Sequence, residues 1–313
     1  MSRNKKIVSV VVPIYNEVSM IGEIYNRVDA VFKRLTNYEY ELVFFDDGST
    51  DGTRDAVEEL CKNHNEVKAV FYSKNFGYLK NTFYCMQQAK GDCGIILHAD
   101  LQNPPELIPE FLDKWEKGTQ VVLGIKNKSK ENKFMYFLRT VFYFLMIKVF
   151  GVRLTPHATE FELFDKSFIE LLKKINTNQP FLRGIVNEYA TRVDYVYYTQ
   201  DIRKKGKSKF NLNKYYDFAI CGITQYSVCL PRRIILCCVI ALALFFAEFC
   251  FVVLPNAGNL DLFNISTAII LRAILVAICI LIIVVCIMFE YIISIKNNVT
   301  DKPWVTEEKR INY

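Results

Sequence analysis

The sequence predicts an α/β domain with a doubly wound, mostly parallel sheet, followed by interfacial helices and two C-terminal transmembrane helices. Two observations lead to this prediction. Within residues 1–125, Val- and Ile-rich runs alternate with stretches of helical spacing, a pattern typical of parallel strands covered by helices on both faces. Nearer the C-terminus, the apolar runs Ile234–Leu254 and Ala273–Phe289 approach the roughly 20 residues that a helix needs to cross a bilayer.

The predicted strands are short apolar runs rich in β-branched residues, as expected of strands buried on both faces of a sheet. They are Ile7–Ile14, Glu41–Phe45, Val67–Tyr72, Gly94–Leu97 and Val121–Leu123. A helix is expected over Met20–Leu35, with Ser19 as its capping residue. No Gly-x-Gly-x-x-Gly or Walker sequence follows any of these strands, which argues against a dinucleotide or P-loop site.

The cysteines and the net charge narrow the class of protein further. The chain of 313 residues has ten cysteines and no Cys-x-x-Cys pair, so neither a disulfide framework nor a zinc site is expected. The net charge of +6 suits an anionic membrane leaflet or a phosphate-bearing substrate better than it suits nucleic acid. We therefore expect a membrane protein that does not bind nucleic acid.

The charges around the apolar runs predict the orientation in the membrane. Arg232 and Arg233 precede the first run and Lys296 follows the second, whereas the loop around Pro255 has no Lys or Arg. The positive-inside rule therefore places both the N-terminal domain and the C-terminal tail in the cytoplasm of an inner or plasma membrane protein. The expected parts are a cytoplasmic domain over 1–210, an interfacial helix over 211–232, a two-helix transmembrane domain over 233–295 and a cytoplasmic tail over 296–313.

Two further apolar stretches are expected to lie on the cytoplasmic leaflet as interfacial helices. They are Phe134–Phe150, which is rich in aromatic residues, and Tyr215–Leu230, which runs into Pro231. The first could instead be a core helix of the domain, because aromatic stripes at helical spacing are usually core.

Carboxylates follow the first two strands. Tyr15 and Glu17 follow the first, and Asp46 and Asp47 end the second, where the sequence continues Gly-Ser-Thr-Asp-Gly-Thr. Such groups suit hydrogen bonds to a nucleobase and a ribose, and they do not suit direct phosphate contact. Part of this segment is also expected to form a capped turn, in which Ser49 or Asp51 starts the next helix.

Several motifs together resemble a known family. They are Val11–Glu17 (VVPIYNE), Asp46–Thr53 (DDGSTDGT), Asn75–Gly77 (NFG), Asp100–Pro105 (DLQNPP), Phe181–Gly184 (FLRG), Arg203–Lys209 (RKKGKSK), Glu290–Ile292 (EYI) and Lys302–Pro303 (KP). Their order and coverage resemble the family 2 glycosyltransferases of GT-A fold. More narrowly, they resemble the polyprenyl-phosphate glycosyltransferases, the group of bactoprenol glucosyltransferases and dolichol-phosphate mannose synthases.

The resemblance implies inverting transfer of a monosaccharide from a nucleotide-diphosphate sugar to undecaprenyl or dolichyl phosphate. A UDP-sugar is expected as the donor in preference to a GDP-sugar. The resemblance also implies a Mg²⁺ or Mn²⁺ cofactor, because charge builds on the leaving diphosphate. A phosphate monoester has a second pKa of about 6, so this acceptor is already ionised near neutral pH and needs no strong base. A homo-oligomer is also implied.

The resemblance assigns roles to residues of this chain. Donor binding is expected from Pro13, Tyr15, Glu17, Asp46, Asp47, Lys74, His98 and Asp100. The metal ligands are expected to be Asp100 and Gln102, with His98 as a third candidate. The acceptor phosphate is assigned to Arg183, Arg203, Lys207, Ser208 and Lys209. The last four could alternatively be only a juxtamembrane basic cluster. The catalytic residues are expected to be Asp100, Glu160 and Arg203.

Two departures from the family pattern leave alternatives open. His98 replaces the first Asp of an Asp-x-Asp motif, which favours Mn²⁺ or a weaker metal site, and it could also simply form a hydrogen bond near the ribose. Glu162 replaces an Arg, so Arg153 or Arg183 must compensate or the donor is held differently. Glu160 takes the acidic position of the same segment, and a solvated carboxylate at a strand edge is its alternative.

These departures keep two other functions open. One is transfer to another lipid, such as a diacylglycerol or a ceramide. The other is a catalytically weakened homologue that binds nucleotide or lipid as a membrane partner.

Overall fold

The computed structural model describes residues 5–129, 140–175, 177, 180–200, 212–227, 229–248, 262–299, 303 and 305–313. The chain divides into two compact units, each described here by itself. The sheet unit comprises Met1–Tyr143, Arg153–Leu212 and Thr300–Tyr313. The helical unit comprises Phe144–Val152 and Asn213–Val299.

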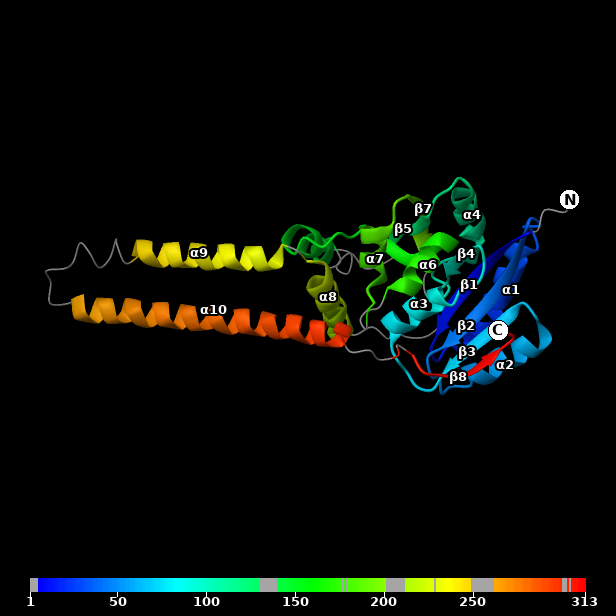
Figure 1. Cartoon of the computed structure of the whole chain (residues 1–313), viewed down its shortest axis with the longest axis horizontal. Coiled ribbons are helices and arrows are strands. Elements are labelled where there is room, and N and C mark those ends of the chain that lie inside the picture. Colours follow the sequence, from blue (N-terminus) through cyan, green and yellow to red (C-terminus); the bar gives the residue numbers. More distant parts are fainter. Residues whose placement is uncertain are drawn as a thin grey trace. The chain divides into compact units, whose positions relative to one another are not determined.

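The described residues of the sheet unit form one sheet of eight strands (Figure 1). The strands are β1 (Lys6–Ile14), β2 (Tyr38–Asp46), β3 (Val67–Tyr72), β4 (Cys93–Ile96), β5 (Val121–Ser129), β6 (Ala158–Asp165), β7 (Val193–Gln200) and β8 (Glu307–Ile311). Their order across the sheet is β7-β5-β6-β4-β1-β2-β3-β8. All five strands predicted from the sequence are therefore confirmed, and β1 lies near the middle of the sheet.

The sheet is mixed rather than mostly parallel. β1 pairs in parallel with β2 and β4, as do β2 with β3 and β5 with β7. β6 runs antiparallel to both β4 and β5, and β8 runs antiparallel to β3. The sequence did not reveal β6, β7 and β8, because two glutamates interrupt β6, tyrosines and polar residues fill β7, and β8 is the charged segment Glu-Glu-Lys-Arg-Ile.

The helices of the sheet unit connect the strands in the alternation that the sequence predicts. They are α1 (Ile21–Phe32), α2 (Thr53–Asn63), α3 (Tyr78–Gln87), α4 (Ile108–Glu116), α6 (Lys166–Lys174) and α7 (Leu182–Tyr189), with short 3-10 turns at η1 (Val18–Met20) and η2 (Pro105–Leu107). The prediction that Ser19 caps the first helix is wrong. Ser19 lies inside η1, and Met20 precedes α1 without a side-chain cap.

The helices pack on both faces of the sheet. On one face, Val28 of α1, Val57 of α2 and Phe111 of α4 are fully buried in the same core as Val10 and Phe44 of the sheet. On the other face, α3 and α6 approach the sheet closely at Gly94. A Cβ atom at this glycine would lie 2.8 Å from Met86 Sδ and 3.2 Å from Ile169 Cδ1, so glycine permits this packing.

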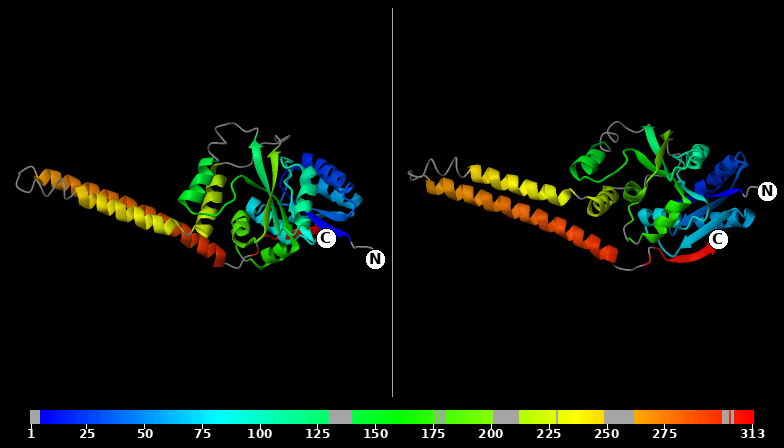
Figure 2. Two further views of the ribbon diagram at one scale, coloured as in Figure 1. Left: turned by 90° about the horizontal axis from the view of Figure 1, so that it is seen from above. Right: turned by 45° about the horizontal axis from the view of Figure 1, so that its top comes forward.

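The helical unit contains α8 (Leu212–Tyr226), α9 (Leu230–Glu248) and α10 (Leu262–Val299). Among the described residues, one helix is long and apolar enough to cross a membrane: Arg272–Asn297 within α10, with a mean hydropathy of 3.2. The first predicted span begins in α9, but its part beyond Glu248 lies outside the described residues. α9 and α10 run side by side in all the ribbon views (Figure 2).

The two helices predicted to be interfacial are present in part, and their position on a leaflet stays a prediction. Residues 134–139 lie outside the described part of the chain, and Thr140–Val149 is a short apolar helix that ends in the π-helical turn η3 (Leu145–Val149). Phe144 in this helix is 59% exposed. The second helix ends at Tyr226 rather than Leu230. Pro231 lies in the first turn of α9, where a backbone N–H would have no partner within the helix, so proline breaks no hydrogen bond there.

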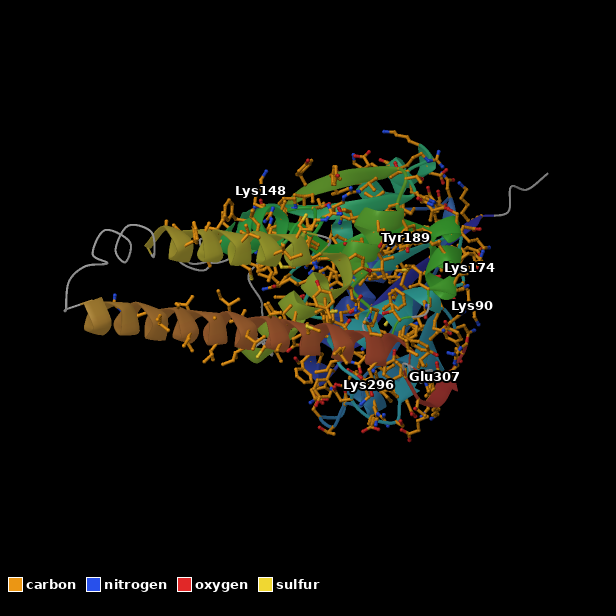
Figure 3. All side chains as sticks on the ribbon, turned by 60° about the vertical axis from the view of Figure 1, so that its left-hand side comes forward. Lys90, Lys148, Lys174, Tyr189, Lys296 and Glu307 are labelled. Atoms are coloured by element: carbon orange, nitrogen blue, oxygen red, sulfur yellow. The ribbon has the colours of Figure 1, made fainter. Side chains whose placement is uncertain are left out.

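The helical unit also has basic residues beside its apolar helices. Arg233 Nη1 donates hydrogen bonds to the carbonyl oxygens of Lys148 and Val149, which are at the end of η3. Figure 3 labels Lys148 and also Lys296, which lies in the last turn of α10. Cations are stabilised near helix C-termini, so these positions suit the helix dipoles.

Candidate functional site

The loops that follow β1 and β2 bind each other directly. Asn16 N donates to Ser49 Oγ at 2.8 Å, and Thr50 N donates to Asn16 Oδ1 at 2.8 Å. Asn16 has a φ of 52°, a left-handed conformation that asparagine tolerates better than most residues. Because β1 and β2 are parallel neighbours, their C-terminal ends meet at one edge of the sheet, and the two loops form one structure there.

Asp46 has its oxygens occupied by the protein itself. The residue is fully buried, accepts hydrogen bonds from Ser49 N, and pairs with Arg54, whose Nε lies 2.8 Å from Asp46 Oδ2. These contacts fix the start of the loop. Donor binding by Asp46 stays a prediction, and the residue's observed contacts are structural.

Asp47 binds the loop after β3 to the loops after β1 and β2. It accepts hydrogen bonds from Phe76 N at 2.6 Å and from Gly77 N at 2.9 Å, just before α3 begins. Burial raises the pKa of Asp47 to about 6, although these two hydrogen bonds oppose the rise. The neighbouring Gly48 has a φ of 75°, and a Cβ there would lie 2.8 Å from the carbonyl carbon of Lys74, so the loops pack too closely for a side chain.

The capped turn expected after β2 is present in modified form. α2 begins at Thr53 behind Gly52, and Thr53 N donates to Asp51 Oδ1 at 3.1 Å. Asp51 therefore satisfies the first N–H of the helix, although the capping position itself belongs to Gly52, whose φ of 88° favours glycine.

The remaining predicted donor residues lie around these loops. Pro13, Tyr15 and Glu17 are partly exposed, and Lys74 is exposed with its Nζ 5.3 Å from the centre of the Phe76 ring. Glu17 N donates to Thr53 Oγ1 at 3.0 Å, which ties this residue to the start of α2. The predicted donor-binding side chains after β1, β2 and β3 therefore come from three loops that hydrogen bonds join together.

The turn after β4 carries the predicted metal ligands. Leu101 has a φ of 50°, an uncommon conformation for a residue with a branched side chain, and its side chain is buried in the core. Leu101 N donates to His98 O, and Gln102 N donates to Asp100 Oδ1 at 3.2 Å. Such strained turns persist only where their surroundings hold them, and they are common at functional sites.

Tyr198 helps to hold this turn, and the sequence did not single it out. Its Oη lies 2.5 Å from Oδ1 of the buried Asn103 and 2.8 Å from Thr159 Oγ1. Thr159 in turn donates to the carbonyl oxygen of Gly124 in β5. The alternation of the Tyr-Val-Tyr-Tyr sequence in β7 was the available signal, because it places one tyrosine inward and its neighbour outward.

β6 brings two glutamates into the interior. Its odd-numbered residues Phe161 and Leu163 belong to the core with α1, α2 and α4, so Glu160 and Glu162 face the opposite side of the sheet. Glu160 is 7% exposed and Glu162 is 1% exposed. The alternative of a solvated glutamate at a strand edge is therefore wrong, because β6 lies between β4 and β5 in the sheet.

Arg183 of α7 is the cation that faces these two carboxyl groups. Its Nε lies 3.2 Å from Glu160 Oε1, and its Nη1 donates to Tyr143 Oη at 3.3 Å. Arg153, the other candidate to compensate for Glu162, is exposed. Burial raises the pKa of Glu160, and Arg183 opposes this rise.

Glu162 carries the larger electrostatic cost. Burial and the neighbouring Glu160 raise the pKa of Glu162 to about 8, and the charge of Arg183 only partly offsets them. Glu162 Oε2 is buried without a hydrogen-bond partner among the described residues. Among the described residues, Arg183 therefore faces two acidic side chains, and burial together with Glu160 favours the protonated form of Glu162.

His98 lies between α3 and β6. The centre of its ring is 5.9 Å from the centre of the Tyr78 ring, and the backbone of Glu160 is close enough to affect its pKa. Burial lowers the pKa of His98 and the charge of Arg183 adds to this effect, whereas Asp100 opposes it. A neutral imidazole at pH 7 can accept a hydrogen bond or bind a metal, so both alternatives for His98 stay open.

The donor set fits a divalent cation that receives most of its ligands from elsewhere. Among the residues that the structure describes, no group of three His, Cys, Asp or Glu side chains could hold a metal ion. Asp100 and Gln102 each carry a side-chain oxygen atom in one turn, where Gln102 N donates to Asp100 Oδ1. Mg²⁺ and similar hard cations are commonly held by one or two carboxylates together with phosphate oxygens and water, so this sparse set fits such an ion.

Four predicted acceptor residues lie outside the described part of the chain. Arg203, Lys207, Ser208 and Lys209 fall within 201–211, so the structure tests neither the acceptor site nor the catalytic role of Arg203. Arg183, the fifth, lies beside Glu160 as described above. Its role toward an acceptor phosphate stays a prediction.

Comparisons with known proteins identify the class. Residues 9–190, more than half of the chain, match the family model for glycosyl transferase family 2. A Bacillus subtilis relative, the uncharacterized glycosyltransferase YkcC, is 34% identical over 220 residues, covering 70% of this chain and 68% of the relative. The chain therefore belongs to glycosyl transferase family 2, and its mixed α/β sheet is of the GT-A kind.

More particular relatives carry bactoprenol in their names. The bactoprenol glucosyl transferase of Shigella phage SfV is 32% identical over 228 residues, covering 72% of this chain and 74% of the relative. Among solved structures, a mycobacterial protein shares the fold with a TM-score of 0.50 at 16% identity, covering 70% of this chain and 73% of that one.

Proposed function

We propose that this protein transfers a monosaccharide from a nucleotide-diphosphate sugar to a polyprenyl phosphate, with inversion, at the cytoplasmic membrane face. The similarity to bactoprenol glucosyl transferases carries this proposal. The turn from His98 to Gln102 after β4 supports it, because it carries side-chain oxygen atoms and its His98 ring lies 5.9 Å from the ring of Tyr78, which follows the loop after β3. The apolar α10 supports a site that receives a lipid-borne acceptor.

The donor would be a UDP-sugar in preference to a GDP-sugar, held by the loops after β1, β2 and β3. Tyr15 and Glu17 are partly exposed there, so an aromatic face and a carboxylate are available to a base and a ribose. Asp47 acts indirectly, because its oxygens already accept two backbone hydrogen bonds that set the loop before α3.

Asp100 and Gln102, with His98 as a further ligand, would hold Mg²⁺ or Mn²⁺. The bound ion would neutralise negative charge on the leaving diphosphate. The protein's own residues then have the task of bringing two anions together. The contacts to the acceptor phosphate would come from Arg183, whose Nε lies 3.2 Å from Glu160 Oε1, and from Arg203, Lys207, Ser208 and Lys209.

The chemical step is a single displacement. An oxygen of the acceptor phosphate forms a bond to C1 of the sugar while the bond from C1 to the diphosphate oxygen breaks, and the electron pair leaves with the nucleoside diphosphate. Because the attack comes from the face opposite the leaving group, the configuration at C1 inverts. Glu160, fixed by Arg183 at 3.2 Å, would orient the acceptor or a sugar hydroxyl and need not remove a proton.

The membrane arrangement is part of the proposal. α10 would form one span, and the apolar run that begins in α9 would form the other, with both termini in the cytoplasm. Arg233, Lys148 and Lys296 would then lie at the cytoplasmic side, in keeping with the positive-inside rule.

The test is an acceptor panel. Membranes containing the full chain are incubated with labelled UDP- and GDP-sugars and with undecaprenyl phosphate, dolichyl phosphate, diacylglycerol or ceramide, in the presence of Mg²⁺ or Mn²⁺. We expect label to appear on a polyprenyl phosphate. Label on diacylglycerol or ceramide would instead identify another lipid glycosyltransferase, and metal-dependent nucleotide binding without transfer to any acceptor would identify a weakened homologue.

A further inference from the structure

The end of the chain returns to the sheet unit as its eighth strand. β8 pairs antiparallel with β3, with Ala69 opposite Ile311 and Phe71 opposite Lys309. In Figure 1 this strand is the red arrow beside β3, at the edge of the sheet next to α2. The sequence marks the segment only as a charged tail, so neither its pairing nor its partners were foreseen.

Side chains of β8 contact the helices on either side of β3. Arg54 Nη1 of α2 donates to Glu308 Oε2 at 2.9 Å, and Lys309 Nζ donates to Glu58 of the same helix at 2.8 Å. From α3, Tyr84 Oη donates to Glu307 Oε1 at 2.5 Å. The tail is therefore bound to α2 and α3, the helices that follow the loops after β2 and β3. The loops after β1, β2 and β3, which are proposed to bind the donor, are called the donor loops below.

Arg54 connects the tail to the loop after β2. Besides Glu308, its guanidinium contacts Asp46 Oδ2 at 2.8 Å and the carbonyl oxygen of Tyr72. Asp46 in turn accepts the N–H of Ser49, which receives the hydrogen bond from Asn16 of the first loop. The side chain of Arg54 thus links the C-terminal strand directly to the hydrogen bonds that shape the loops after β1 and β2.

The tail also contacts the third loop through the backbone. Ser73 N, directly after β3, donates to Thr306 O at 2.9 Å. Three residues further on, Phe76 N and Gly77 N donate to Asp47. The segment at 306–308 therefore contacts the starts of both loops that Asp46 and Asp47 organise.

We propose that the C-terminal strand is a positioning element of the nucleotide-sugar site, in which Glu308 acts on the donor loops through Arg54. This inference rests on the proposed donor site. Only residues 300–306 separate the end of α10 at Val299 from β8, so the segment that orders the donor loops follows the apolar helix directly in the chain. Glu308 is a positioning residue and touches no substrate.

The competing explanation is that β8 merely covers the edge of the sheet. Exposed edges promote association between chains, and natural proteins often protect them. That role predicts a change in stability or aggregation when the tail is altered, without a specific change in donor affinity. The Arg54–Glu308 pair distinguishes the two, because it contributes little to edge protection and leads directly to Asp46.

The expected effect is modest, because the side chain of Glu308 is 55% exposed and that of Arg54 is 29% exposed. Ion pairs of this kind contribute roughly 0.2–1 kcal/mol, which corresponds to a change of about 1.4- to 5-fold. They are also screened by salt, and the Debye length falls to about 3 Å at 1 M. A dependence on salt is therefore a signature of this pair.

The test compares Glu308→Gln with the matched control Lys309→Gln in the full chain in detergent. Lys309 lies on the same strand and pairs with Glu58, away from Asp46. We expect Glu308→Gln to raise the KM for UDP-glucose about two- to five-fold at unchanged kcat, with the difference lost at about 1 M salt. We expect Lys309→Gln to leave KM unchanged. Equal KM values for Glu308→Gln and wild type, or equal shifts in both variants, would overturn the proposal.

Hydrogen exchange separates this inference from the proposed function. In Glu308→Gln without any ligand, amides of residues 46–53 and 73–77 should exchange at least two-fold faster than in Lys309→Gln, whatever the enzyme's activity. Unchanged exchange at these amides would contradict the inference alone. A wild-type chain that transfers no sugar would instead contradict the proposed function.

Discussion

The loops after β1, β2 and β3 differ from the site at β4 and β6 in how their polar groups are used. In the loops, Asp46 and Asp47 accept backbone N–H groups, and Asp46 also pairs with Arg54. At β6, Glu160 and Glu162 are buried with one facing cation, Arg183, and Glu162 Oε2 has no hydrogen-bond partner among the described residues. The acidic side chains of the loops are therefore bonded to groups of the protein itself, whereas Glu162 in the β4–β6 region has a buried oxygen without such a partner among the described residues.

This difference suggests a division of labour. A self-bonded loop system is preorganised, so a donor binding there would not have to order it first. A region with buried and unbalanced carboxyl groups is costly in isolation, and sites of chemistry commonly carry such costs. Changes in the first region should therefore act on donor affinity and stability, and changes in the second on turnover and on the response to pH.

The largest expected effect belongs to Asp100→Asn in the turn after β4. The amide is a poorer ligand for a hard cation than the carboxylate, and we expect transfer to fall by about 100-fold or more. Initial rates with labelled UDP-glucose and undecaprenyl phosphate measure the loss. The control is Asp113→Asn on an exposed position of α4, which should retain wild-type transfer. Full activity of Asp100→Asn would exclude the metal assignment.

A smaller loss is expected for Asp47→Asn in the loop system. An amide can replace only one of the two oxygens that accept Phe76 N and Gly77 N, so the loop before α3 should loosen. We expect the donor KM to rise about ten-fold and the free energy of unfolding to fall by about 1–3 kcal/mol. Steady-state kinetics and chemical denaturation measure both, with the exposed Asp55→Asn as control. A fall in kcat at unchanged KM would contradict the division of labour.

Glu162→Gln should change how stability depends on pH. The pKa of Glu162 is raised to about 8 in the folded protein, so the folded state binds a proton more tightly than the unfolded state. The stabilisation from this group is complete below pH 4.5 and is lost as the pH rises toward 8. The glutamine cannot titrate, so the variant should lose less stability across this range than wild type, by an amount on the order of a few kcal/mol.

Denaturation of the full chain in detergent at several pH values measures this difference in slope. Asp47, whose pKa is raised to about 6, contributes a slope of the same sign to both proteins and cancels in the comparison. The exposed Glu59→Gln serves as control and should keep the slope of the wild type. Parallel slopes for wild type and Glu162→Gln would show that Glu162 is ionised in the folded protein.

The smallest expected effect is that of Tyr198→Phe. Loss of the hydroxyl removes the link between Asn103 and Thr159, so the turn that carries Asp100 should be held less firmly. We expect a few-fold fall in kcat and about 1 kcal/mol lower stability. The neighbouring Tyr197 is 57% exposed, so Tyr197→Phe is a matched control that should behave as wild type. Identical kcat values in the two variants would show that the Tyr198 hydroxyl does not position the turn that carries Asp100.

The sequence predicts the apolar half of this fold well and the polar half poorly. β1 to β5 were found because Val and Ile runs bounded by turns mark buried parallel strands. β6 was missed because Glu160 and Glu162 break its apolar pattern, and only their partners across the sheet show that they are buried. β8 was missed because a charged edge strand differs little from a solvated tail until β3 pairs with it.

The same limit applies to the site. The motifs located the loops and the turn after β4, but the roles within them depend on contacts distant in sequence. Arg54 is engaged with Asp46 and with Glu308, which lies 254 residues further along the chain. Tyr198 reaches Asn103 across 95 residues. No local pattern encodes such partners, because they are set by how the strands are ordered in the sheet.

The most direct test of the central claim is transfer by the purified full chain in detergent, with a panel of labelled UDP- and GDP-sugars, undecaprenyl phosphate and Mg²⁺ or Mn²⁺, before and after chelation. We predict a labelled polyprenyl-phosphate sugar of inverted configuration at C1, formed only while the divalent ion is present. A wild-type chain that binds the nucleotide sugar but forms no such product with any donor of the panel, or forms it undiminished after chelation, would contradict the account.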